Sequence, residues 1–433
     1  MKKRSIFTAL VVLAFLSASL TSCLGNDDDV IYTDDAAITA FSLGTVYQYS
    51  HVTSSQGTDS IVKTSVTSAA YRFYIDQLNR EIYNPDSLPY GTDAEHILCT
   101  IVSRNSGTVT FKDLEDEDKQ TYYNSSDSID FRQPRTVYVY SISGKGRNTY
   151  TIRVNVHQQE PDEFNWTLVA DGGMPFGTDH YKQVLSDPEA MRHVADGVLY
   201  EASPWSAEPQ WSKAFDIPGV SQMLHYGQHR LYAIDATGRL VASSNAPTDW
   251  TNGVVWEPES IEEDNADQMP DEDLRLVRLP SLMNVGANYL VLVGRNTRMA
   301  EGSNAVVWGK VEETDQYAEH QPWYYYTPAA MNKYPLPALR NLQAVPYDGD
   351  ILAFGTQDDG QLSPLYLSRD KGLTWPETSL VALPEDFRPP TTDYALVAGS
   401  DGYLWLADGA GKRLWRGRLN RLGWKEIDRS ITE

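Results

Sequence analysis

Short runs of alternating apolar and polar residues, separated by turn residues, follow one another from about residue 36 onward. The clearest is 150–156, in which Tyr, Ile and two Val alternate with Thr, Arg and Asn. Such alternation is typical of a half-buried antiparallel strand. The apolar run 136–140 precedes it, and the glycine-containing turn 143–146 lies between the two. This arrangement predicts a β-hairpin.

The segment 36–160 contains further strand patterns and no run with a helical period. The additional predicted strands are 37–43, 71–75, 97–102 and 108–111. About seven short strands in a segment of this size favour a β-sandwich. Its ending resembles the bacterial Ig-like and cadherin-like domains with which many Bacteroidetes lipoproteins begin, which implies an Ig-like β-sandwich.

The tryptophans divide the chain. All eleven lie at or beyond Trp166, and the change coincides with the polar, proline-containing stretch 158–163. Such a stretch is suited to a linker. We therefore expect a domain boundary near residue 162, with a first domain over 36–160 and a second over 164–433.

The second domain carries a blurred internal repeat. Six of its tryptophans recur at intervals of 45 residues (Trp166, Trp211, Trp256) and of 52 and 49 residues (Trp323, Trp375, Trp424). A period of about 45–50 residues is typical of propeller blades with four strands each.

The repeat units can be superposed as an apolar strand, a Gly/Asp/Asn turn, a second strand and a closing aromatic residue. Five such units lie at 231–241, 289–308, 351–367, 394–406 and, in a poorer copy, around 198–200. Trp166 supplies either a closing strand or the remnant of a sixth unit. The sequence thus predicts an all-β chain, with a β-propeller of five or alternatively six blades behind the sandwich.

One motif supports the propeller. Ser368, Asp370, Gly372, Thr374 and Trp375 match all the defined positions of S-x-D-x-G-x-T-W, and the segment resembles the BNR repeat, or Asp-box, of sialidases and other propellers. Ser and Asp can accept hydrogen bonds from turn amides, Gly permits a positive φ, and Trp packs beneath the turn. The resemblance implies a structural role on the outside of a blade, in a kelch- or BNR-like propeller.

Two segments are partial echoes of this motif. One is Ser243-Ser244-Asn245 with Trp250, and the other is Ser303-Asn304 near Trp308. Both lack the full pattern.

The N-terminus predicts export. A basic start at residues 2–4 is followed by an apolar run over 6–20, which is shorter than the roughly 20 residues of a spanning helix. The run ends in Leu20-Thr21-Ser22-Cys23, which resembles a lipobox. The resemblance implies a lipoprotein signal peptide over 1–22 and acylation of Cys23, and hence anchoring to the outer membrane. Ordinary cleavage near Ala18, with Cys23 as a plain thiol, is the alternative.

The acidic segment after the cysteine bears on location. Asp27, Asp28 and Asp29 lie in the tether 23–35. The tether is similar to those of Bacteroidetes lipoproteins, which implies exposure at the cell surface; a generic solvated linker is the alternative. The layout as a whole resembles uncharacterised Bacteroidetes surface lipoproteins that pair these two domain types.

Composition excludes several classes of protein. The 433 residues include 36 Lys and Arg against 59 Asp and Glu, a net charge of −23, which becomes −26 without the three basic residues at the start. So acidic a chain repels phosphate backbones, so we expect no nucleic-acid partner. Apart from Cys23 the only cysteine is Cys99, on the apolar face of a predicted strand. A buried core thiol is the expected role, and an unpaired nucleophile is the alternative.

Catalytic and metal-binding motifs of the common kinds do not occur in the sequence. His225 and His229 have i, i+4 spacing, but Gly227 argues against a helix that would bring them together. The acidic run 262–273 lacks the order of an EF-type calcium loop, and a solvated loop is the preferred interpretation over a calcium site. No cofactor and no metal site are predicted.

A propeller glycosidase is the rival hypothesis. It needs paired carboxylates, or Tyr with Glu, in the central pocket. Asp235, Asp348 and Asp401 lie near strand ends that could face such a pocket. Acidic residues are common in this chain, however, and no arginine cluster for a sialidase can be assigned. Whether the protein is an enzyme stays open, and the sequence favours a non-catalytic role.

The positive signal for binding is aromatic. Trp323, Tyr324, Tyr325 and Tyr326 are consecutive, and aromatic faces stack on sugars and anchor protein interfaces. Trp205 is a lesser candidate. Packing of a closing strand between blades is the alternative for the four aromatics. We therefore expect a surface module that binds a glycan or a protein; the rivals are the sialidase-like glycoside hydrolase and a structural component of a surface complex.

Overall fold

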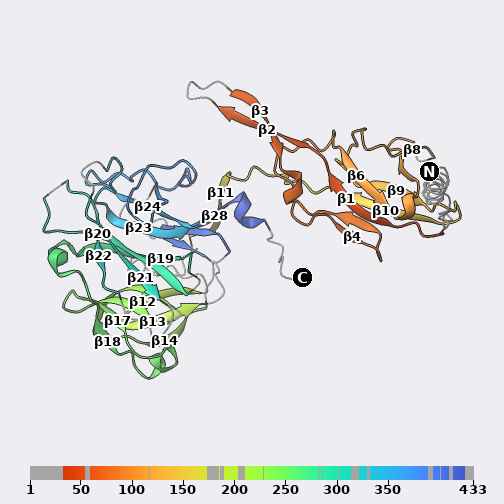
Figure 1. Ribbon diagram of the computed structural model, residues 1–433. Helices are drawn as coiled ribbons and strands as arrows, with labels where there is room; N and C mark the ends of the chain where they lie inside the picture. The colour runs from red at the N-terminus through yellow and green to blue at the C-terminus, as the bar shows by residue number, and fades with distance from the viewer. Residues whose placement is uncertain are drawn as a thin grey trace, which may run out of the picture. The chain divides into compact units, whose positions relative to one another are not determined.

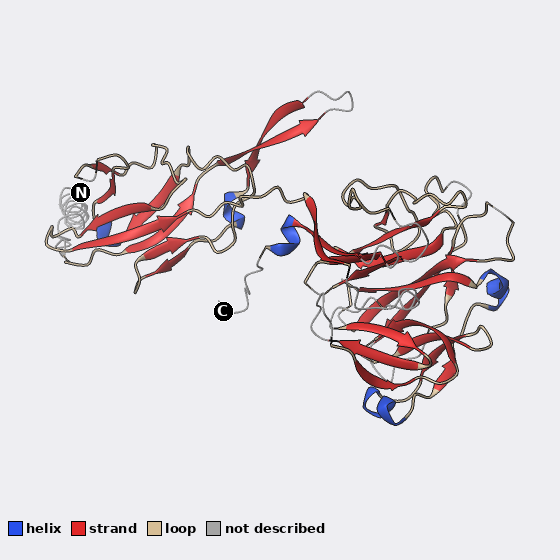
Figure 2. Cartoon of the chain, turned by 180° about the vertical axis from the view of Figure 1, so that it is seen from behind, coloured by secondary structure: helices blue, strands red, loops and turns tan. Residues whose placement is uncertain are grey.

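The computed structural model is built almost wholly from β-strands, with a few short 3-10 turns (Figure 2). It describes residues 33–53, 59–116, 118–172, 185, 190–202, 210–227, 229–281, 283–284, 286–300, 302–313, 321–328, 332–388, 394–399, 401–408 and 413–424. The chain divides into two compact units, one up to Gln158 and one from Gln159 to Lys425. Each is described by itself.

The described part of the first unit has ten strands and two 3-10 turns. They are β1 (Ile38–Leu43), β2 (Val46–Thr53), β3 (Asp59–Val66), η1 (Ser68–Ala70), β4 (Tyr74–Asp76), β5 (Glu81–Tyr83), β6 (Cys99–Ser103), η2 (Arg104–Ser106), β7 (Val109–Lys112), β8 (Gln120–Tyr122), β9 (Arg135–Tyr140) and β10 (Arg147–Arg153).

Six of these strands form one mixed sheet in the order β4-β5-β10-β9-β7-β8, in which β5 and β10 are parallel. β1 pairs with β6, and the β2–β3 hairpin extends from the body of this unit (Figure 1). The predicted hairpin of β9 and β10 is confirmed. The prediction for 71–75 began too early, because β4 starts at Tyr74. β2 and β3 were not predicted.

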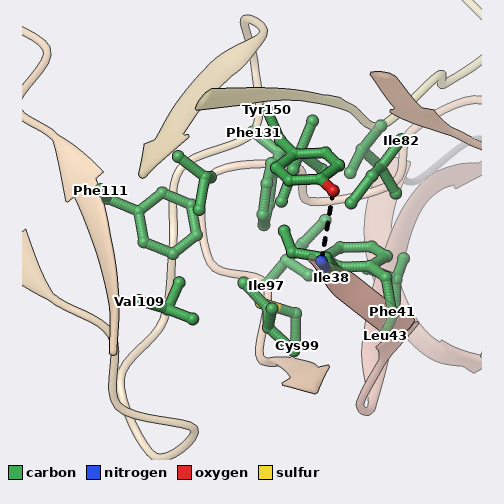
Figure 3. Close-up of a cluster of buried hydrophobic side chains, with 14 of the residues drawn as sticks. Ile38, Phe41, Leu43, Ile82, Ile97, Cys99, Val109, Phe111, Phe131 and Tyr150 are labelled. Atoms are coloured by element: carbon green, nitrogen blue, oxygen red, sulfur yellow. Dashed lines mark hydrogen bonds between the residues drawn. The ribbon is translucent and has the colours of Figure 1, made fainter. Parts of the chain in front are cut away.

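The core of this unit lies between β1, β6 and the large sheet (Figure 3). Tyr150 and Ile152 of β10 are buried against Ile38 of β1, and the Ile38 amide donates to the Tyr150 hydroxyl at 3.4 Å. Cys99 of β6 is 2% exposed within the same cluster, and burial raises the pKa of its thiol to about 12. A thiol that stays protonated and covered has the core role expected for it.

The second unit contains five antiparallel sheets in its described part, each of three or four strands. The order of hydrogen-bonded strands within each sheet is β12-β13-β14, β15-β16-β17-β18, β19-β20-β21-β22, β23-β24-β25 and β11-β28-β27-β26. The bounds are β11 (Phe164–Asp171), β12 (Met191–Ala195), β13 (Val198–Ala202), β14 (Ser212–Asp216), β15 (Val220–Tyr226), β16 (Leu231–Asp235), β17 (Leu240–Ser243), η4 (Pro247–Asn252), β18 (Trp256–Pro258), η5 (Glu263–Gln268), β19 (Glu272–Pro280), β20 (Ala287–Arg295), β21 (Val306–Glu313), β22 (Tyr324–Tyr325), β23 (Arg340–Tyr347), β24 (Asp350–Thr356), β25 (Tyr366–Ser368), β26 (Tyr394–Ala398), β27 (Leu404–Asp408), β28 (Arg413–Leu419) and η6 (Asn420–Gly423).

The ends of this unit are paired. β11, its first strand, runs antiparallel to β28, its last, with Trp166 opposite Gly417. Of the two roles expected for the Trp166 segment, the structure shows the closing strand. Pairing residues so distant in sequence links the two ends of the unit through backbone hydrogen bonds.

The repeated tryptophans mark the spaces between sheets. Trp211, Trp256, Trp323, Trp375 and Trp166 each pack against an apolar cluster whose members come from two different sheets. Trp375, for example, shares its cluster with strands β19 to β21 on one side and β23 to β25 on the other. The period in the sequence therefore reflects the repeated contribution of a tryptophan from each sheet to the interface with its neighbour, and Trp250, Trp308, Trp405 and Trp415 join the same clusters.

Candidate functional site

The S-x-D-x-G-x-T-W segment forms a closed hydrogen-bonded turn directly after β25. The Asp370 carboxylate accepts from the Thr374 amide at 2.8 Å and from the Thr374 hydroxyl at 2.7 Å. The Ser368 hydroxyl donates to Asp370 at 3.0 Å and accepts from the Gly372 amide at 2.8 Å. The Trp375 indole donates to the Gly372 carbonyl at 3.0 Å. All the side chains that define the motif are used within the turn, which makes it rigid.

The same turn packs against the neighbouring sheet. Gly372 has φ +96°, and a Cβ atom there would lie 2.9 Å from Val291 and 3.0 Å from Val307. The ammonium group of Lys371 lies 3.2 Å from the ring centroid of Tyr289 in the same sheet. Glycine is therefore required both by the backbone conformation and by the close approach of the next sheet.

The aromatic segment divides between core and surface. Trp323 is fully buried, donates its indole N–H to Glu259 at 2.9 Å and meets Tyr232 edge-to-face. Its expected role as an exposed stacking face is wrong, because a glutamate 64 residues away in sequence holds the ring inside an inter-sheet cluster. The alternative expected for this segment, packing between blades, holds for this residue. Tyr324 is 47% exposed.

Beside this segment lies a cleft of about 330 Å³. Its walls come from residues 325–328, from the turn 372–375, and from Asn304, Ala305, Val307, Asn332, Pro335 and Leu336. It thus brings together Tyr325, Tyr326 and the Asp-box turn, two features of the sequence that had no predicted connection. A cleft of this size is at the lower end of the range for small-ligand sites.

The walls of this cleft are held in place by hydrogen bonds. Asn332 donates to the Leu373 carbonyl at 3.0 Å and accepts from the Tyr334 amide at 2.9 Å, and the Trp375 amide donates to the Tyr334 carbonyl at 2.7 Å. Tyr326 lies directly over Gly309, where any Cβ atom would meet its ring. These contacts form the cleft before any ligand arrives.

The cleft combines apolar surface with uncharged polar groups. Burial raises the pKa of the Tyr326 phenol, which therefore stays uncharged. Asn304 and Thr327 are exposed, and within the described residues neither side chain makes a hydrogen bond. Such an arrangement can bind a neutral ligand that has both apolar faces and hydroxyl groups.

A buried charged cluster lies next to the aromatic segment but has a structural character. Glu259 forms ion pairs with Lys310 and with Arg230, the latter at 3.2 Å, in addition to its bond from Trp323. The side chains of Lys310 and Glu259 are only 2% and 3% exposed. Desolvation lowers the pKa of Lys310 even though Glu259 opposes the shift. The carboxylate is buried and held by three partners, which is typical of a structural ion-pair cluster.

A small cavity of about 30 Å³ lies among strands of four different sheets. Its lining comes mainly from β15, β19, β23 and β26 and includes Gln222, Arg275 and Leu396. None of the described residues that line it is a carboxylate.

The three predicted aspartates are engaged elsewhere. Asp235 accepts bonds from Thr237 and Arg239 in its own turn, which lowers the pKa of its carboxyl. Asp348 pairs with Arg421, and Asp401 accepts from the Tyr403 amide at 3.2 Å. The structure therefore does not place them together in a central pocket.

The two histidines of the predicted pair lie in different environments. His225 of β15 is buried, and burial followed by the charge of Arg278 lowers its pKa to about 3, whereas His229 is exposed. No group of three or more potential metal ligands occurs among the described residues. In the same part of the chain, no helix is long and apolar enough to cross a membrane.

One partial echo of the Asp-box lies at the position in its sheet that is equivalent to that of the full motif. Trp250 follows β17, the third strand of its sheet, is 2% exposed and donates to the Asn245 carbonyl at 3.1 Å. Ser303 and Asn304 instead precede β21, so they are not at the equivalent position. Cys23, Trp205, the signal segment and most of the tether lie outside the described residues.

Two family models match the chain. One, described as the DUF6242 beta propeller domain, covers residues 120–427, and the other, the N-terminal domain of the same family, covers 41–154. The chain belongs to the DUF6242 family. Its second unit is accordingly a β-propeller domain, built from the five sheets above. None of the curated proteins compared with the chain matches it.

Solved structures resemble the chain only distantly. A family 117 glycoside hydrolase from Zobellia galactanivorans has 11% identity and a TM-score of 0.31, covering 62% of this chain and 94% of its own. The Trypanosoma rangeli sialidase has 11% identity and a TM-score of 0.25, with 87% and 58% covered. The family AA12 enzyme of Trichoderma reesei has 9% identity and a TM-score of 0.28, with 59% and 96% covered.

Proposed function

We propose that this DUF6242 protein is a lipid-anchored, cell-surface protein whose propeller binds carbohydrate without transforming it. The observation that carries the proposal is the preformed cleft between Tyr325, Tyr326 and the Asp-box turn. Aromatic and proline surfaces beside neutral amides and hydroxyls are complementary to a sugar ring, which has apolar faces and a polar rim.

The small cavity among β15, β19, β23 and β26 favours a binding protein over a hydrolase. Glycoside hydrolysis by two carboxylates needs a cleft that holds a sugar between them. The small cavity among β15, β19, β23 and β26 has about a tenth of the volume of the proposed cleft, and no carboxylate among the described residues lines it. The aspartates named from the sequence are occupied in turns and ion pairs.

The proposal includes the finer architecture. We take each of the five sheets as one blade, joined by five inter-sheet clusters and by the β11–β28 pair. The first unit is then an Ig-like stalk, and Cys23 is the lipidated residue that anchors the acidic tether to the outer membrane.

The binding proposal is tested with Leu373→Asp on a glycan array. Leu373 lines the cleft and is 54% exposed, so the change should not disturb the core. We expect the bound glycans of the unchanged chain to be lost. Leu78→Asp, at a 95% exposed leucine of the first unit, is the matched control and should bind normally. A blank array for the unchanged chain, or equal binding by both variants, would refute the proposal.

The anchoring proposal has its own test. Cys23→Ala should release the protein from the membrane fraction, because two or three acyl chains hold it there and none would remain. Unchanged membrane association of the variant would contradict lipid anchoring without affecting the binding cleft.

A further inference from the structure

We infer that the cleft selects uncharged sugars and rejects uronic and sialic acids, an inference that rests on the proposed binding function. The first support is the lining itself. None of the described residues around the cleft carries a charge, although charged residues make up 22% of the chain.

Two of the three nearest charges in sequence are directed to other partners. Asp370 is saturated by Ser368 and Thr374 within the Asp-box turn. Lys371 lies over Tyr289 of the neighbouring sheet. Lys333 is exposed and is not among the residues that line the cleft. A carboxylate held in the cleft would therefore lose its water without gaining a counter-charge from the lining, which is costly.

The net charge of the protein adds to this selection. At −23, the chain presents a repulsive field to any anionic ligand that approaches. A neutral ligand approaches without that penalty. Desolvation inside the cleft and repulsion outside it therefore act in the same direction.

The free polar groups indicate what the ligand offers in return. Asn304 supplies an amide and Thr327 a hydroxyl, whereas the Tyr326 ring supplies aromatic surface. An amide and a hydroxyl both donate and accept, as sugar hydroxyls do. A volume of about 330 Å³ suits a ligand of one or two rings, and longer chains would continue across the surface.

The test is calorimetric titration of the full mature chain with matched oligosaccharides: galactose oligomers against galacturonate oligomers, and cellobiose against its glucuronate counterpart. We expect binding of at least one neutral probe and at least about tenfold weaker binding of its acidic counterpart. Added salt alone should not make the two affinities equal. Thr327→Lys should narrow that ratio at least about tenfold by adding a cation to the rim, whereas Thr327→Val should leave it unchanged. Unchanged tryptophan fluorescence would show that both variants are folded.

The outcomes separate the two levels of the proposal. Tighter binding of the acidic probes that is weakened by Leu373→Asp would overturn the charge selection and leave the binding function standing. Binding of neither class, or binding that no cleft variant alters, would overturn the binding function and this inference with it. A peptide that binds the cleft in place of every sugar would also overturn both.

Discussion

Removal of the buried carboxylate of Glu259 should destabilise the propeller strongly. Glu259 is 3% exposed and neutralises Lys310, which is 2% exposed and sits on β21 of the neighbouring sheet. Glu259→Met would leave Lys310 buried without its counter-charge and would also take the acceptor from Trp323. Breaking a buried pair from one side costs about 3–5 kcal/mol. For a domain with about 5–15 kcal/mol of total stability this is a large fraction.

The chain provides a selective assay for this effect. All eleven tryptophans lie at or beyond Trp166, so their fluorescence during urea unfolding reports on the second unit alone. We expect a lower urea midpoint for Glu259→Met, with an unchanged dependence on urea concentration. The double variant with Lys310→Met should recover part of the loss, because it removes the unpaired ammonium group, whereas Arg230 and the Trp323 indole still lack Glu259.

Two results would refute this reasoning. One is a cost below about 1 kcal/mol for Glu259→Met, which would mean that water reaches the pair in solution. The other is a double variant whose loss equals the sum of the two single losses, since residues in direct contact should show coupling.

Three further predictions follow from single contacts. Gly372→Ala should destabilise the propeller by about 1–3 kcal/mol more than Gly360→Ala, because both have positive φ but only the first would press a Cβ against Val291; equal urea midpoints would contradict the account. The pKa of His225 is about 3 in the folded protein and about 6.5 in the unfolded chain. The free energy of unfolding of the second unit should therefore be highest above about pH 6.5 and should decrease as the pH falls toward about 3. The same decrease in a His225→Leu chain would count against this. In a soluble chain beginning at Leu24, Cys99 should resist a thiol reagent at pH 8 and react fully in urea; rapid labelling of the folded protein would show that it is not buried.

The sequence was most informative where the signal is local or periodic. The Asp-box hydrogen bonds all fall within eight residues, so their pattern could be predicted from the residue types alone. In the second unit, strands such as β16, β20, β24 and β26 were found because each has an apolar core and an aromatic partner at a regular interval, whereas β15, β19, β23 and β28 were not predicted. β9 and β10 were found by their alternation.

Distant contacts and exposed strands could not be predicted from local or periodic patterns in the sequence. Which of four consecutive aromatics is buried depends on Glu259, 64 residues before Trp323. The β2–β3 hairpin escaped detection because Tyr47, Val52 and Ile61 are 40%, 45% and 64% exposed, so it has no buried face to create an alternating pattern. The cleft itself requires residues 325–336 to lie beside 372–375, which only the packing of neighbouring sheets determines.

The most direct test of the central claim is a titration of one bound oligosaccharide against two tyrosine variants of the same segment. Tyr326 lines the cleft and packs with Trp375 and Val307, whereas Tyr324 is exposed and does not line it. The account predicts that Tyr326→Ala weakens binding about tenfold or more while Tyr324→Ala leaves it within about twofold, with both variants retaining native fluorescence. Equal affinities for the two variants, or a larger loss for Tyr324→Ala, would contradict it.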